Sequence, residues 1–89
     1  MYELQNWCYE RGWKNVIKDG VQSWVGIVDS NGHKWKITWV PMGSTSFECL
    51  DCHIPIIIKE PIDDVGEMEW LISHLQYNLF DGKSGFYQD

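Results

Sequence analysis

VQSWVGIVDSNGHKWKITWVP, residues 21–41, is the stretch that decides the fold of this chain. Its second half alternates apolar with charged or polar side chains, which is the period-two pattern of a β-strand buried on one face. The alternating residues are Trp35, Ile37 and Trp39 on one side and Lys34, Lys36 and Thr38 on the other. Before them stands Asp29-Ser30-Asn31-Gly32, whose residue types favour a turn. The stretch therefore predicts a β-hairpin.

Two turn geometries fit this hairpin, and the choice between them decides which side chains are buried. Asn31-Gly32 alone favours a two-residue type I′ turn, whereas the whole run from Asp29 favours a type I turn with a glycine bulge. A difference of one residue in register moves every side chain to the opposite face. We predict the bulged register, in which Asp29 faces His33, because it gathers more apolar residues on one side. That face would carry Val25, Ile27, Trp35, Ile37 and Trp39, and Trp24 would lie on the other.

Shorter elements are predicted before the hairpin. Leu4, Trp7 and Cys8 have the spacing of an apolar stripe on a helix over residues 3–11, and Gly12 is typical of a helix end. Residues 13–17 have the composition of a short strand. A turn at Asp19-Gly20 then leads into the hairpin.

Strands and a second helix are predicted after the hairpin. Residues 47–50 and 53–59 indicate two short strands or one bent strand, and Pro55 marks an edge strand or a bulge. Residues 64–80 predict an amphipathic helix, with Asp64 and Glu67 at capping-box spacing and Gly82 as its C-cap. The apolar stripe of this helix comprises Val65, Met68, Ile72, Leu75 and Leu79, with Leu71 alongside.

These elements predict an α+β fold in a single domain over residues 1–89. A short N-terminal helix, an antiparallel sheet of three to five strands and a C-terminal helix on one sheet face make up this fold. The predicted core contains Val25, Ile27, Trp35, Ile37, Met68, Ile72 and Leu75. The order of elements resembles that of the double-stranded-RNA-binding module, but that module needs a basic cluster where this chain begins its last helix with acidic residues.

The charge of the chain disfavours two classes of partner. Thirteen acidic and seven basic residues give a formal net charge of −6, which opposes binding to nucleic acid and to an anionic membrane. No apolar run approaches the roughly 18 residues that span a bilayer, and the N-terminus lacks the features of a signal peptide. Three cysteines, an odd number, then indicate thiols in a cytoplasmic protein.

The segment Cys49-Leu50-Asp51-Cys52-His53 matches the C-x-x-C-H pattern of covalent haem attachment. Haem attachment requires export, for which the chain shows no signal, so haem is disfavoured. Zinc needs two ligands beyond Cys49 and Cys52, and the candidates are His53, Cys8, His33 and His74. Because none of these forms a second pair at standard spacing, we predict no cofactor and no metal. A zinc-binding domain built on Cys49, Cys52 and His53 stays as the alternative reading.

We predict that the chain is not an enzyme, because it has no nucleophile elbow, no phosphate-binding loop and little volume for a pocket. Six tryptophans in 89 residues are hard to bury completely, and exposed tryptophans often anchor interfaces. An acidic stretch opens the last helix. The sequence therefore predicts a small acidic protein-interaction module, an inhibitor or immunity-type protein with a basic protein partner, and leaves a homodimer open. Its predicted partner-binding residues are Trp24, Asp63, Asp64, Glu67, Glu69 and Trp70.

Overall fold

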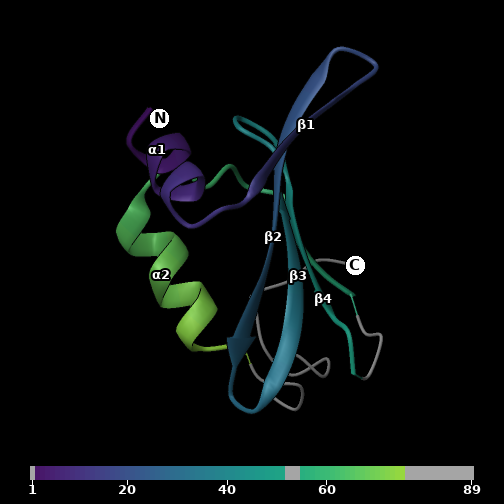
Figure 1. The fold of residues 1–89 in the computed structure, drawn as a ribbon, viewed down its shortest axis with the longest axis vertical. Coiled ribbons are helices and arrows are strands. Elements are labelled where there is room, and N and C mark those ends of the chain that lie inside the picture. Colours follow the sequence, from purple (N-terminus) through teal and green to yellow (C-terminus); the bar gives the residue numbers. More distant parts are fainter. Residues whose placement is uncertain (1, 52–54, 76–89) are drawn as a thin grey trace.

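A five-stranded antiparallel sheet with two helices on one face forms the computed structural model, which describes residues 2–51 and 55–75 (Figure 1). The elements in chain order are α1 (Tyr2–Glu10), β1 (Lys14–Lys18), β2 (Val21–Ser30), β3 (His33–Trp39), β4 (Thr45–Cys49), β5 (Pro55–Ile58) and α2 (Val65–Ser73). Each strand pairs with the next along the chain, so the sheet order is β1-β2-β3-β4-β5. The predicted α+β class, with a helix before and after a small antiparallel sheet, is confirmed.

The hairpin of β2 and β3 has the two-residue turn and not the bulged turn. Ser30 pairs with His33, and the loop between them is Asn31-Gly32, with φ angles of 52° and 81°. Positive φ at both loop residues is the requirement of a type I′ turn, whose twist matches that of the flanking strands. The predicted pairing of Asp29 with His33 is therefore wrong by one residue along β2.

This register reverses the predicted faces of β2. Trp24 pairs with Trp39 and faces the helices, where it is only 7% exposed. Ile27, expected in the core, is 61% exposed, and Val25 is half-buried. The physical reason is area, because burying the indole of Trp24 removes more apolar surface from water than burying either aliphatic side chain.

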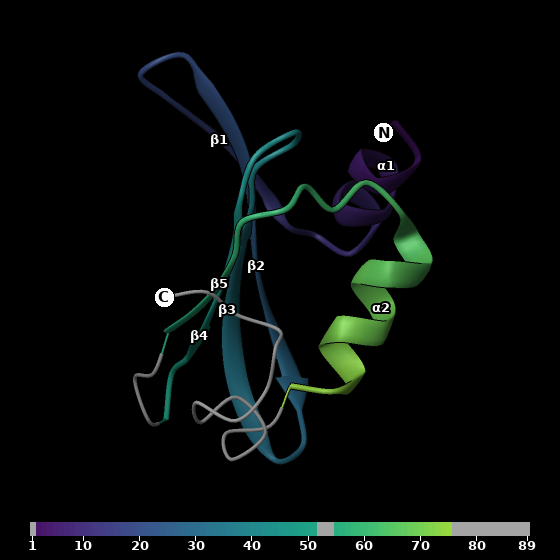
Figure 2. The same ribbon diagram turned by 180° about the vertical axis from the view of Figure 1, so that it is seen from behind.

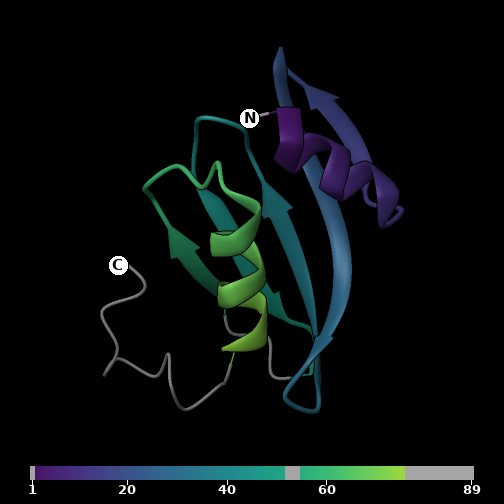
Figure 3. The same ribbon diagram turned by 90° about the vertical axis from the view of Figure 1, so that its left-hand side faces the viewer.

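The hydrophobic core lies between the sheet and the two helices, which Figure 3 shows side by side over the same sheet face. Its buried members are Leu4, Trp7, Cys8, Trp13, Trp24, Trp35, Ile37, Trp39, Phe47, Cys49, Ile56, Ile62, Met68, Leu71 and Leu75. Ile72, also predicted there, is half-buried at the margin. Gly26 makes room for one indole, because a Cβ at this position would lie 2.3 Å from Cδ2 of Trp13.

The buried tryptophans also connect segments through their indole N–H groups. Trp39 donates to the carbonyl of Ile62 at 2.7 Å, which fixes the segment that crosses from β5 to the helices (Figure 2). Trp35 donates to the carbonyl of Ser30 at 3.3 Å. The indole N–H of Trp24 is buried without a hydrogen-bond partner among the described residues. Five of the six tryptophans are thus buried, and their abundance reflects the core more than an interface.

The second helix begins as predicted. Asp64 is the N-cap of α2, and its carboxylate accepts the backbone N–H of Glu67 at 2.9 Å. This bond satisfies one of the N–H groups that a helix start leaves without a partner inside the helix. Both carboxylates lie near the positive end of the helix dipole, where negative charge is stabilising.

The helix ends at Ser73, although residues 64–80 were expected to be helical. The hydroxyl of Ser30 donates to the carbonyl of Ile72, and Nδ2 of Asn31 donates to the carbonyl of Leu75 at 2.7 Å. The β2–β3 turn thus bonds carbonyls that a further helical turn would use. The predicted positions Leu79 and Gly82 lie outside the described residues. Within the described ranges, neither helix has the length and hydropathy needed to cross a bilayer.

The two edges of the sheet differ in character. Pro55 begins β5, the edge strand that its proline predicts, because proline lacks the N–H that a central strand would use. The other edge is β1, whose residues are all exposed. The tip of the β1–β2 hairpin projects beyond the other strands (Figure 1). Ile17 and Val21 lie near this tip and are exposed on it.

Candidate functional site

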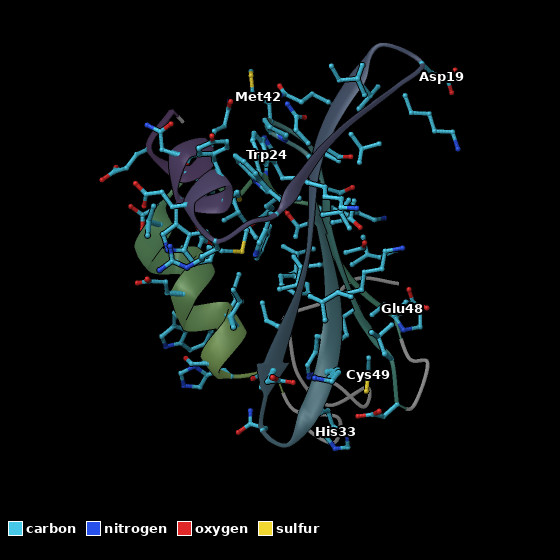
Figure 4. The ribbon with its side chains drawn as sticks, viewed as in Figure 1. Asp19, Trp24, His33, Met42, Glu48 and Cys49 are labelled. Carbon is cyan, nitrogen blue, oxygen red and sulfur yellow. The ribbon has the colours of Figure 1, made fainter. Side chains whose placement is uncertain are left out.

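Among the described residues, the two helices and the segment before α2 carry most of the exposed acidic side chains. We call this region the acidic helix layer, and its exposed acids are Glu3, Glu10, Glu60, Asp63, Asp64, Glu67 and Glu69. Of the predicted binding residues, the acids and Trp70 all lie here. Trp24 does not, because it is buried between the sheet and α1, as Figure 4 shows. Its prediction as an exposed anchor depended on the bulged register and is wrong.

Trp70 is the exposed tryptophan of the chain, with 46% of its surface accessible. Its indole stacks on the imidazole of His74, with ring centroids 4.1 Å apart and planes inclined by 22°. Nδ1 of His74 lies 2.7 Å from the carbonyl oxygen of Trp70, and the Ser73 hydroxyl donates to the same oxygen at 2.9 Å. These contacts hold an aromatic platform in a defined orientation on the surface of α2.

Glu69 has a structural role that sequence reasoning missed. Its Oε2 accepts the indole N–H of Trp7 at 3.1 Å and lies 3.7 Å from the guanidinium of Arg11. The same guanidinium lies over the Trp7 ring, 4.0 Å from its centroid. Glu69 therefore joins α2 to α1, and its charge is partly balanced within the molecule. No spacing rule connects residues so far apart in the chain, so the sequence carried no signal for this contact.

The remaining acids of the predicted site are of two kinds: one is bonded within the protein, and two are exposed. Asp64 is occupied as the N-cap of α2. Asp63 and Glu67 are exposed, and neither has an ion-pair partner within the part of the chain that the structure describes. Glu67 and Trp70 are three residues apart on the helix and so share a side of it, which adjoins the side of the buried Met68 and Leu71. The candidate binding residues that stay available to a partner are Asp63, Glu67 and Trp70.

The lysines of the strands lie on the sheet face that the helices leave uncovered, which we call the open face. Lys14 pairs with Val25 and Lys18 with Val21, while Lys36 pairs with Ile27, and residues paired across strands share a face. The exposed or half-buried members of this face include Lys14, Lys18, Val21, Val25, Ile27, Asp29, Lys34, Lys36 and Glu48. The strand lysines therefore lie on the opposite side of the sheet from the acidic helix layer.

A second group of side chains, which could bind a metal ion, lies where β3 begins and β4 ends. His33, Cys49 and Asp51 each offer one ligand atom, and these atoms all lie within 4.8 Å of one another. Sequence analysis named His33 and Cys49 as ligand candidates but did not connect them with Asp51. Cys52 and His53, the rest of the predicted cluster, lie outside the described residues.

The other core cysteine has a different environment. Burial raises the pKa of the Cys8 thiol to about 12, against the smaller opposing effect of the Arg11 charge. At neutral pH this thiol is protonated and unreactive, since the thiolate is the nucleophile and the metal ligand.

Comparison with known proteins gives no relative, because no family model, curated protein or solved structure matches this chain.

Proposed function

We propose that this chain is a small acidic protein-interaction module that binds a basic protein partner through the outer side of α2. The observation that supports it best is the separation of charge between the two faces of the sheet. Most of the exposed acids among the described residues lie in the acidic helix layer, whereas the strand lysines lie on the open face, where Asp29 and Glu48 accompany them. The acids of this layer outnumber the basic residues Arg11 and Lys59 that adjoin the helices, and this excess of negative charge speeds association with a positively charged surface.

Trp70 supplies the apolar anchor of the proposed interface. Interface hot spots are enriched in tryptophan and are surrounded by residues that exclude water. The stacked His74 holds the indole in place, so less side-chain entropy is lost on binding. Glu67 and Asp63 form the charged rim beside it. A module of this kind that covers a basic functional surface of another protein would act as its inhibitor or immunity protein.

The experiment isolates the partner by affinity capture and then measures its association rate as a function of salt concentration. We expect Glu67→Lys to slow association and to reduce the salt dependence, because it removes a steering charge from the contact face. Glu48→Lys is the matched control, because it makes the same charge change on the opposite side of the sheet (Figure 4). Equal effects of the two reversals would show that net charge alone matters and would overturn the proposed face.

Trp70→Ala tests the anchor in the same assay. We expect faster dissociation, by about tenfold or more, because a hot-spot tryptophan contributes at least about 1–2 kcal/mol to binding. The association rate should change little, since the substitution leaves the charges in place. An unchanged dissociation rate would assign Trp70 to packing on α2 and not to the partner.

A further inference from the structure

We propose that His33, Cys49 and Asp51 form a binding site for a zinc ion between the start of β3 and the end of β4. Nδ1 of His33 lies 3.2 Å from Oδ2 of Asp51, and the Cys49 Sγ completes a triangle with no side longer than 4.8 Å. Figure 4 shows His33 and Cys49 at the same end of the sheet. The proposal goes beyond the interaction function and shares no residue with that interface.

The backbone of the sheet brings these three residues together. Cys49 pairs with Trp35, which places it diagonally across from His33 on the same sheet face. The N–H of Leu50 donates to the carbonyl of Lys34 at 2.8 Å, and the N–H of Lys34 donates to Oδ2 of Asp51 at 3.3 Å. Strand pairing thus holds the ligand positions close together before any ion binds, which lowers the entropic cost of binding.

The three donor atoms suit zinc. Imidazole nitrogen, thiolate sulfur and carboxylate oxygen are the ligands that zinc takes in proteins, in a tetrahedral arrangement. Two ligand atoms at usual zinc bond lengths lie about 3.5 Å apart, so closing this triangle needs side-chain movements of about an ångström. Cys49 is buried and would be the inner ligand, while Asp51 is exposed and faces solvent. Water then completes the fourth position.

Zinc binding moves one proton within the site and releases another. The contact between His33 Nδ1 and Asp51 Oδ2 requires a proton between the two atoms. When zinc binds Nδ1, the proton of the neutral imidazole moves to Nε2, and the Cys49 thiol releases its proton to solvent as it becomes a thiolate.

Cobalt(II) is the probe, because it occupies zinc sites and its thiolate complexes absorb in the near ultraviolet. We expect the purified chain, stripped of metal under reducing conditions, to bind one cobalt ion with a thiolate charge-transfer band that zinc abolishes. Cys49→Ser should remove this band. His33→Ala and Asp51→Asn should each weaken zinc binding by about tenfold or more, since even residues behind the ligands change affinity by that factor.

Matched controls separate this site from other cysteines and histidines. Cys8→Ser and His74→Ala should leave the cobalt spectrum and the zinc affinity unchanged, since neither residue belongs to the triangle. Circular dichroism establishes that each variant is folded, and Asp51→Asn provides a test that leaves the core intact because Asp51 is exposed. Absence of stoichiometric cobalt binding would overturn the proposal. So would binding that Cys52→Ser abolishes while His33→Ala and Asp51→Asn do not weaken it.

Discussion

The two faces of β2 differ more than the sequence of this strand suggests. Toward the helices it presents Trp24 and Gly26, the first buried and the second in contact with the Trp13 ring. Away from them it presents Val25 and Ile27, which are more apolar than that glycine and yet half-buried and exposed. The comparison teaches that the buried face of a strand is chosen by the total surface it removes from water, including that of its neighbours, and not by its number of apolar residues.

The sharpest test of this comparison makes the same substitution on each face. Ile37→Ala should destabilise the chain by about 2–5 kcal/mol, because Ile37 is 0% exposed and its removal leaves a cavity in the core. Ile27→Ala should cost less than about 1 kcal/mol, since substitutions of exposed residues have small effects. Urea unfolding measures both. Equal costs would support the bulged register, in which both side chains share the core face.

A smaller effect is expected where the glycine of β2 contacts an indole. Gly26→Ala should cost about 1–3 kcal/mol, because the new methyl group overlaps the Trp13 ring and the indole must move. The cost should fall in a Trp13→Ala background, where the obstruction is gone. A double-mutant cycle by thermal or urea unfolding measures this coupling. Additive costs would mean that Gly26 is needed for another reason.

The smallest effect concerns the two hairpin turns. Asn31→Gly keeps the positive φ of the turn but removes the hydrogen bond from Nδ2 to the Leu75 carbonyl, so we expect a loss of about 0.5–1.5 kcal/mol. Asp19→Gly in the β1–β2 turn, which also has positive φ, is the control and should be close to neutral. If chemical unfolding shows equal changes for both variants, the bond to the Leu75 carbonyl contributes nothing measurable to stability.

Local patterns predicted the elements well, since alternation, turn residues and caps act between near neighbours. The strand over β3, the N-cap at Asp64 and the edge position of Pro55 all followed from such patterns. The register of β2 did not, because it depends on the Trp13 indole reaching Gly26 from another element. The early end of α2 has the same origin, in bonds from the β2–β3 turn.

In the candidate site, too, features set by near neighbours could be predicted and features set by distant contacts could not. Helical spacing predicted that the acidic Glu67 and the aromatic Trp70 are both exposed on α2. Glu69 could not be separated from them, because its bond to Trp7 joins residues 62 positions apart. The triangle of His33, Cys49 and Asp51 likewise depends on the pairing of β3 with β4, which only a known register provides.

The order of the strands has a consequence for how the chain folds. Since every strand pairs with its neighbour in the chain, the sheet can grow by successive short loop closures, each with a small entropic cost. The hydrogen bond of Trp7 to Glu69 joins the two helices across 62 positions and so closes a long loop. We therefore expect a transition state in which the β2–β3 hairpin is formed and α1 is not yet docked on α2.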